Sequence, residues 1–136
     1  MSAAASPVHP ARSRRLLIAD GCVETRRMIR NALSATFPEI LESTDGRSLF
    51  WALEAHLRAV SDPVPDLLVI ADERMPVYSG LLALEAWSDA EHHFPFIVLS
   101  SAPDDTVRAR VEAMGALLLR KPFSPRKLCR MLQKLL

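Results

Sequence analysis

Short apolar runs alternate with longer amphipathic segments along most of this chain. The runs predict strands in five places, at residues 15–20, 39–43, 66–72, 96–99 and 116–120. Except for residues 39–43, they are apolar on both faces, which is typical of a parallel sheet with helices packed on each side. The pattern therefore favours a sheet buried in the centre of the molecule.

Residues at helical spacing follow the predicted strands. The apolar ones are Ile29, Leu33 and Phe37, then Leu49, Leu53 and Leu57, then Val107, Val111 and Met114, and finally Leu128, Leu132 and Leu135. The remaining helix is predicted from Ser79, a competent N-cap residue, to Trp87. Pro38 should end the first helix, and Gly115 should follow the fourth in the C′ position. Strand and helix alternate five times, which predicts an α/β fold with a doubly wound, five-stranded parallel sheet and helices on both faces.

Four of the predicted strands deliver a polar residue at their carboxyl ends: Asp20, Asp72, Ser100 and Lys121. The carboxyl ends of parallel strands lie at one edge of the sheet, where α/β proteins bind ligands. Each residue alone has a structural explanation, because Asp and Ser often cap the next helix and a lysine is often solvated. Together they predict a site that combines two carboxylates, a hydroxyl and an ammonium.

Length and composition limit the possible functions. A chain of 136 residues corresponds to one domain, here residues 15–136, and we expect residues 1–14 to be a disordered leader. The formal net charge of +1 gives no basis for bulk attraction to nucleic acid or anionic membranes. No apolar run approaches the ~20 residues of a membrane span. Cys22 and Cys129 have no metal-ligand or CxxC spacing, so we expect free thiols in a cytoplasmic protein.

Three motifs in this order give the chain a family resemblance. They are Asp72-Glu73-Arg74-Met75-Pro76 with Ser79-Gly80, then Phe96-Ile97-Val98-Leu99-Ser100-Ser101, and then Lys121-Pro122-Phe123. With these motifs, the chain resembles the receiver domain of bacterial two-component response regulators, which include the small chemotaxis regulators. The resemblance runs from about Arg15 to Leu136, nearly the whole chain, and it implies a flavodoxin-like strand order, 2-1-3-4-5, and a cis peptide before Pro122.

The resemblance also assigns roles to the residues at the predicted sheet edge. It implies that Asp72 accepts a phosphoryl group from a histidine kinase or a phosphotransfer protein, and that Ser100 and Lys121 bind this group. It further implies that Mg²⁺ is held by Asp20, Asp72 and the backbone carbonyl of Arg74. These roles suit phosphoryl transfer, because the charge of the transferred group must be neutralised while the reacting atoms are held in line.

The sequence departs from the family pattern at two positions. Gly21 follows Asp20 where the family has a second acidic residue, so one expected carboxylate ligand is absent and we expect weaker Mg²⁺ binding. Glu24 and Glu73 are acids close by in the sequence, but neither occupies the missing position. Leu118 stands at the switch position, where the family has an aromatic residue, and a leucine brings less surface and no hydroxyl to that switch.

Two alternatives within the α/β class fit the motifs less well. A haloacid-dehalogenase-like phosphatase would need an acid where this chain has Cys22, and a flavin binder would need a Ser/Thr/Gly-rich loop in place of residues 21–27, GCVETRR. We therefore expect that the protein is not an enzyme. Two functions remain open: a phosphoacceptor, and a phosphorylation-independent pseudo-receiver that binds partner proteins, which Gly21 and Leu118 favour.

The chain ends with its last predicted helix, so we expect a stand-alone receiver with no attached output domain. Its output would then be contact with a downstream target protein, or relay to another phosphoacceptor. We expect no direct binding of nucleic acid or of a membrane. The expected assembly is a monomer or a weak homodimer.

Overall fold

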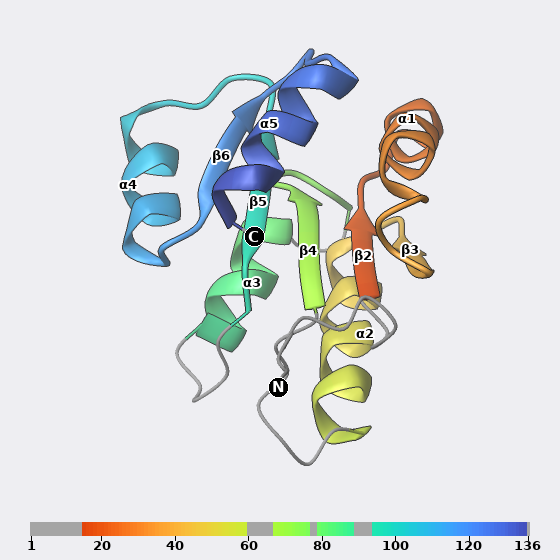
Figure 1. Ribbon diagram of the computed structural model, residues 1–136. Helices are drawn as coiled ribbons and strands as arrows, with labels where there is room; N and C mark the ends of the chain where they lie inside the picture. Colours follow the sequence, from red (N-terminus) through yellow and green to blue (C-terminus); the bar gives the residue numbers. More distant parts are fainter. Residues whose placement is uncertain (1–14, 60–66, 77–78, 89–93, 136) are drawn as a thin grey trace, which may run out of the picture.

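The computed structural model describes residues 15–59, 67–76, 79–88 and 94–135 (Figure 1). The predicted leader, residues 1–14, lies outside the described residues. Five strands form one parallel sheet: β2 (Arg15–Ala19), β3 (Glu39–Ser43), β4 (Leu67–Asp72), β5 (Phe96–Ser100) and β6 (Leu117–Arg120). Their order across the sheet is β3-β2-β4-β5-β6. Counted along the chain, this is the order 2-1-3-4-5, so the predicted fold class is confirmed.

Helices cover both faces of this sheet. They are α1 (Val23–Leu33), α2 (Gly46–Ala59), α3 (Gly80–Ser88), α4 (Asp105–Ala113) and α5 (Pro125–Leu135). Helices α1 and α5 lie on one face, and α2, α3 and α4 lie on the other (Figure 1). Among the described residues, none of the helices combines the length and apolarity that crossing a membrane would require.

The two hydrophobic cores follow from the alternation of side chains along the strands. In β2, Leu16 and Ile18 pack in the core shared with α1 and α5, whereas Leu17 and Ala19 pack in the core shared with α2, α3 and α4. Successive residues of a strand point to opposite faces, so a strand between two helical layers is apolar at every position. Each fully buried leucine or isoleucine stabilises the fold by ~1.5–3 kcal/mol, and the sheet holds its carboxyl edge in a fixed frame.

Helix ends match the sequence predictions with one exception. Gly115 follows α4 with φ of 71°, the left-handed conformation that a C′ glycine adopts without strain. Helix α1 ends at Leu33, whereas apolar spacing predicted that it would continue to Phe37. The residue before a proline disfavours helical backbone, and the chain leaves the helix in turns whose Thr36 and Phe37 N–H groups donate to the Leu33 carbonyl, both at 3.0 Å. Phe37 still reaches the core from this turn.

Candidate functional site

The carboxyl edge of the sheet brings together the ends of four strands. Asp20 follows β2, Asp72 ends β4, Ser100 ends β5, and Lys121 follows β6. The Lys121 N–H donates to the Ser100 carbonyl at 2.8 Å, which continues the β5–β6 pairing past the end of the strand. The peptide between Lys121 and Pro122 is cis, as the resemblance implied.

Three of these side chains meet in what we call the Lys121 cluster: Asp20, Asp72 and Lys121. The Lys121 Nζ atom lies 2.7 Å from Asp20 Oδ2 and 2.8 Å from Asp72 Oδ2. The Asp20 side chain is 1% exposed, and the side chains of Asp72 and Lys121 are 15% and 18% exposed. Two carboxylates therefore share one ammonium in a largely desolvated place, which leaves the cluster with an excess negative charge.

Burial and charge shift the pKa values in this cluster. Burial raises the pKa of Asp72 above its usual range, the nearby Asp20 carboxylate adds to the increase, and the Lys121 hydrogen bond opposes it. For Lys121, burial alone would lower the pKa, but its hydrogen bonds to Asp20 and Asp72 outweigh burial and raise it. Lys121 therefore stays charged at neutral pH. The ammonium, shared with Asp20, only partly offsets the cost of ionising the buried Asp72 carboxylate.

The loop after β2 holds Asp20 in place. Its Oδ1 atom accepts a hydrogen bond from the Cys22 N–H at 2.8 Å, and its backbone carbonyl accepts one from Arg26 Nη1 at 2.7 Å. The N-cap of α1 is Cys22, which makes no side-chain capping bond, and the N-cap of α4 is Asp104. Neither Asp20 nor Ser100 caps a helix, so the capping explanation for these residues is wrong.

Ser100 is fully buried, and its hydroxyl is directed at an acid that follows Asp72. The Ser100 Oγ donates a hydrogen bond to Oε1 of Glu73, whose side chain is almost completely buried. The Glu73 N–H donates to the Leu99 carbonyl at 2.8 Å, so the backbone pairing of β4 with β5 extends one residue beyond Asp72. The sequence reasoning considered Glu73 only as a substitute metal ligand. A second acid at the end of a buried strand was the signal that it needed a partner.

Gly80 explains the Ser79-Gly80 pair behind the Asp72 motif. A Cβ atom at Gly80 would lie 2.1 Å from the Asp72 carbonyl oxygen and 2.9 Å from Met75 Cε. Only a glycine allows the start of α3 to approach the end of β4 this closely. The Ser79 Oγ accepts a hydrogen bond from the Leu82 N–H at 3.0 Å, so Ser79 caps α3 as predicted.

The positions that depart from the family pattern have clear surroundings. A Cβ atom at Gly21 would have only the Thr44 carbonyl oxygen as a neighbour, at an ordinary contact distance of 3.9 Å, so the position has room for a side chain. Glu24 is exposed on α1, and the Glu73 carboxylate accepts a hydrogen bond from Ser100, so Glu73 already has another partner. Leu118 packs, partly buried, against the core shared with α2, α3 and α4.

The donor set fits Mg²⁺ only with help from water. Within residues 15–59, 67–76, 79–88 and 94–135, no group of three His, Cys, Asp or Glu side chains is arranged to hold a metal ion. The carboxylates of Asp20 and Asp72 are hard oxygen ligands of the kind that Mg²⁺ takes, and Mg²⁺ commonly keeps several waters. The excess negative charge of the Lys121 cluster favours a cation there.

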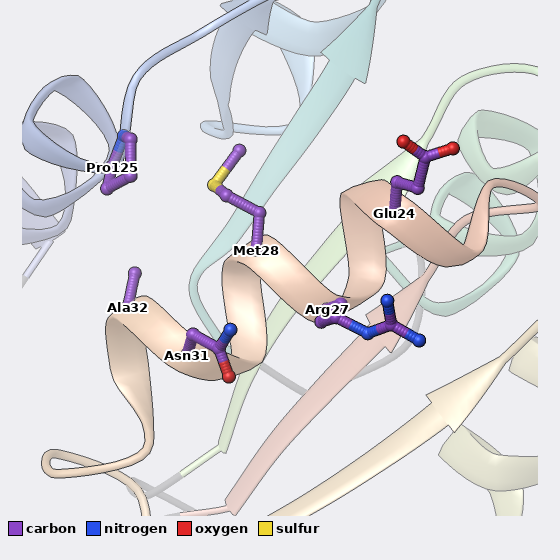
Figure 2. Close-up of a pocket in the computed structure, with 6 residues that line it drawn as sticks. All are labelled: Glu24, Arg27, Met28, Asn31, Ala32 and Pro125. Atoms are coloured by element: carbon purple, nitrogen blue, oxygen red, sulfur yellow. The ribbon is translucent and has the colours of Figure 1, made fainter.

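Two hollows lie beside the cluster. A pocket of ≈ 470 Å³ is lined by Lys121, Cys22, Thr25 and Phe123 among others, so the ammonium can be approached from solvent. A groove of ≈ 550 Å³ runs between α1 and α5. Figure 2 shows Met28 and Ala32 rising from α1 on the side of Pro125, with Glu24 at the other end of the helix. Met28 lines both hollows, which places the groove next to the pocket.

Comparisons with known proteins agree with this geometry. No protein-family model matches the sequence, and a search of curated proteins finds no match. Among solved structures, the chain is similar to the chemotaxis protein CheY4 of Vibrio cholerae, with 26% identity, a TM-score of 0.70, and coverage of 90% of this chain and 98% of that one. It shares its fold with CheY of Borrelia burgdorferi, solved as a CheX-CheY-BeF3-Mg complex, at 19% identity, a TM-score of 0.75, and coverage of 88% and 87%.

A third similar structure is the signal receiver domain of an HD domain-containing protein from Pseudomonas fluorescens. It is 20% identical with a TM-score of 0.75, and the match covers 96% of this chain and 90% of that one. These neighbours are consistently CheY-like signal receiver domains of response regulators, so the resemblance inferred from the motifs around Asp72, Ser100 and Lys121 is confirmed.

Proposed function

We propose that this domain is a receiver in two-component signal transduction that accepts a phosphoryl group on Asp72 from a histidine kinase or a phosphotransfer protein. The observation that supports this function best is the Lys121 cluster. Its ammonium lies 2.8 Å from the proposed acceptor carboxylate and 2.7 Å from a second, buried carboxylate. An ion pair that only stabilises the fold needs one carboxylate for each ammonium. The second carboxylate here supplies negative charge that attracts a metal ion.

In the proposed reaction, a carboxylate oxygen of Asp72 attacks the phosphorus atom of a phosphohistidine. The new O–P bond forms as the N–P bond breaks, and the imidazole leaves with the bonding electron pair. Lys121 turns from the Asp72 carboxylate to a phosphoryl oxygen and neutralises part of its charge. Asp20 keeps the ammonium at the edge during this change, because it holds Lys121 from the other side.

Mg²⁺ would be held by the carboxylates of Asp20 and Asp72, by the backbone carbonyl of Arg74 and by water. When bound, it supplies positive charge to the phosphoryl oxygens. Because Gly21 brings no carboxylate, we propose that this chain binds Mg²⁺ more weakly than a receiver with two acids after the first strand.

The second candidate is a pseudo-receiver that binds partners without being phosphorylated. Two observations favour it: Gly21 removes a ligand, and the Ser100 hydroxyl is already bonded to Glu73. Both candidates place the output in protein contacts, with a downstream target or a relay partner, and neither requires enzymatic turnover. We propose that the domain acts in the cytoplasm as a monomer or weak homodimer. Cys22 and Cys129 are exposed and form no disulfide, and they would remain thiols there.

Labelling by a small phosphodonor tests the function. Wild type, Asp72→Asn, Gly21→Asp and Gly21→Asn are incubated with acetyl phosphate across a magnesium titration, and the phosphorylated fraction is measured by intact mass. Wild type should label at high magnesium and Asp72→Asn should not. Gly21→Asp should lower the magnesium midpoint about tenfold, which corresponds to ~1.4 kcal/mol, because it adds an anionic ligand where a side chain fits. Gly21→Asn has the same shape without the charge and should shift the midpoint less.

The results separate the two candidates. Labelling of Gly21→Asp without labelling of wild type at any magnesium concentration would support the pseudo-receiver. Labelling of Asp72→Asn as strongly as wild type would show that the acceptor has been misassigned. If none of the variants labels, the phosphoacceptor function is wrong for this chain.

A further inference from the structure

The contact between Glu73 and Ser100 is a feature of this site that the proposed function does not use. Glu73 is 8% exposed and Ser100 is fully buried, so water does not compete for this hydrogen bond. The acceptor is an anionic carboxylate, and hydrogen bonds to ionised acceptors are about twice as strong as neutral ones. The Ser100 Oγ also accepts from the Ala102 N–H at 3.3 Å, which orients the hydroxyl from the loop that follows β5.

A serine hydroxyl has one proton to donate. In the proposed function, a phosphoryl oxygen on Asp72 requires that proton, but the carboxylate of Glu73 already takes it. The two acceptors are adjacent in sequence at the end of β4, and β4 pairs with β5, the strand that ends at Ser100. The hydroxyl cannot serve both.

We propose that Glu73 is a positioning residue that holds the Ser100 hydroxyl in the unphosphorylated domain and competes with the phosphoryl group for it. This inference rests on the proposed function of Asp72. Phosphorylation then has to break the Ser100–Glu73 hydrogen bond, and the strength of that bond sets how tightly the domain holds a phosphoryl group. Glu73 also gives the domain a switch element close to the site, where Leu118 supplies no aromatic ring.

The position of α4 offers a route for the change to travel. Arg110 of α4 pairs with Glu85 of α3, with its Nε atom 2.9 Å from Glu85 Oε2. The hydrogen bond to Glu85 raises the Arg110 pKa most, and the charge of Glu73 contributes to the same increase, so Glu73 lies within the field of Arg110. A buried carboxylate that loses its hydroxyl donor needs another partner. A shift of Arg110 from Glu85 toward Glu73 would couple the loss of the Ser100 bond to the α3–α4 contact.

A double-mutant cycle tests the competition. The proteins are wild type, Glu73→Gln, Ser100→Ala and the double variant, and the probe is the phosphoryl analogue BeF3⁻ with saturating Mg²⁺, titrated by calorimetry. Glutamine keeps the shape of Glu73 and leaves a weaker, neutral acceptor. Glu73→Gln should bind the probe about tenfold more tightly than wild type, which corresponds to ~1.4 kcal/mol. Glu112→Gln on the exposed surface of α4 makes the same charge change away from Ser100 and should bind as wild type does.

The cycle also separates competition from simple charge repulsion. Removing the Glu73 charge near an anion tightens binding whether or not Ser100 has a hydroxyl, whereas competition requires that hydroxyl. We expect Glu73→Gln to have an effect at least threefold larger with Ser100 present than with Ala at that position, since interacting residues are non-additive. In the unliganded wild type, the Ser100 hydroxyl proton should be slow to exchange and visible by NMR. The chemical shift of this proton should change when BeF3⁻ binds, and its signal should be absent in Ser100→Ala.

Each result has one meaning. Equal effects of Glu73→Gln in both backgrounds would overturn the competition and leave only charge repulsion. Binding by wild type that Glu73→Gln does not tighten would overturn the proposal but leave the phosphoacceptor function standing. An absence of probe binding in every variant would overturn the phosphoacceptor function, and this inference would fall with it.

Discussion

The two ends of strand β2 carry two polar clusters that differ in charge balance. At its carboxyl end, the Lys121 cluster joins two carboxylates to one ammonium. At its amino end, the Arg15 cluster consists of Arg15, Glu39 and His56. In it, Arg15 Nη1 lies 2.7 Å from His56 Nδ1, and Arg15 Nη2 donates to Glu39 Oε2 at 2.9 Å. One cation therefore faces one anion and a neutral acceptor.

The difference shows which polar cluster is built for a ligand. The Arg15 cluster is balanced in charge, because the guanidinium of Arg15 faces one carboxylate and one imidazole. The Lys121 cluster is not balanced, because two carboxylates pair with one ammonium. The extra negative charge favours the binding of a metal ion, which phosphoryl transfer requires. Carboxylates whose pKa values are shifted by burial and by neighbouring charges concentrate at functional sites for this reason. The Arg15 cluster is also more exposed, because its Arg15 and Glu39 side chains are 27% and 43% exposed.

The largest effect is expected when the single cation of the Lys121 cluster is removed. Lys121→Met leaves the buried Asp20 carboxylate and the Asp72 carboxylate side by side without a counter-charge. We expect a loss of ~3 kcal/mol in the free energy of unfolding at pH 7, the size typical of removing one partner from a buried ion pair. Urea unfolding followed by circular dichroism measures it.

The control is Lys127→Met on the exposed face of α5, which makes the same change of residue at the surface and should alter stability by under ~0.5 kcal/mol. Part of the Lys121→Met loss should return at pH 5, because protonation of a carboxylate relieves the repulsion. A loss equal to that of Lys127→Met would mean that the two carboxylates are solvated, contrary to their burial.

A smaller effect of opposite sign is expected when one acid of the same cluster is neutralised. The folded state raises the pKa of Asp72, so ionised Asp72 destabilises the fold. The stability that the protonated form provides is present below the ordinary pKa and is lost as pH rises through the raised one. Asp72→Asn should therefore increase the free energy of unfolding at pH 7 by about 1 to 2 kcal/mol, as is common when a functional residue is replaced. Thermal and urea unfolding measure the change.

The matched change in the Arg15 cluster should have the other sign. Glu39→Gln removes the balancing anion of a partly exposed pair, so it should lower stability by under ~1 kcal/mol. If Asp72→Asn were destabilising by a similar amount, the two clusters would be alike, and the charge imbalance would have no functional meaning.

Much of the Lys121 cluster followed from the sequence, because the ends of parallel strands share an edge and the residues there are read directly from the chain. Asp20, Asp72 and Lys121 needed only the strand assignments to be brought together. The partner of Ser100 did not follow. A hydroxyl can turn to any acceptor within reach, and the choice of Glu73 depends on a side-chain rotamer and on the depth of burial, which periodicity does not report.

The early end of α1 and the Arg15 cluster were missed for related reasons. Apolar spacing places Phe37 on the core side whether it stands on a helix or in a turn, so the pattern does not locate the helix end. His56 falls on α2 one turn from core positions and pairs with a residue 41 positions away in sequence. Long-range polar pairs of this kind leave no periodic signal, and only the fold brings them together.

The smallest expected effect is the contribution of His56 in the Arg15 cluster to the pH dependence of stability. His56 is buried, and burial lowers its pKa, with the positive charge of Arg15 adding to the decrease and Glu39 opposing it. The folded state therefore binds this proton less readily than the unfolded state, so stability should fall as pH drops through the ordinary value of about 6.5. In the neutral histidine, Nδ1 accepts a hydrogen bond from Arg15. Protonation would place an N–H on Nδ1, facing the Arg15 guanidinium, and would remove this acceptor.

We expect wild type to lose ~1 kcal/mol between pH 7.5 and pH 5.5 relative to His56→Asn, which keeps an acceptor near the Nδ1 position but does not titrate. Comparing the pH dependence of urea unfolding in the two proteins cancels the contributions of all other groups, Asp72 included. Parallel curves would show that His56 titrates equally in both states, and that the amino end of β2 is not the closed, charge-balanced cluster its geometry describes.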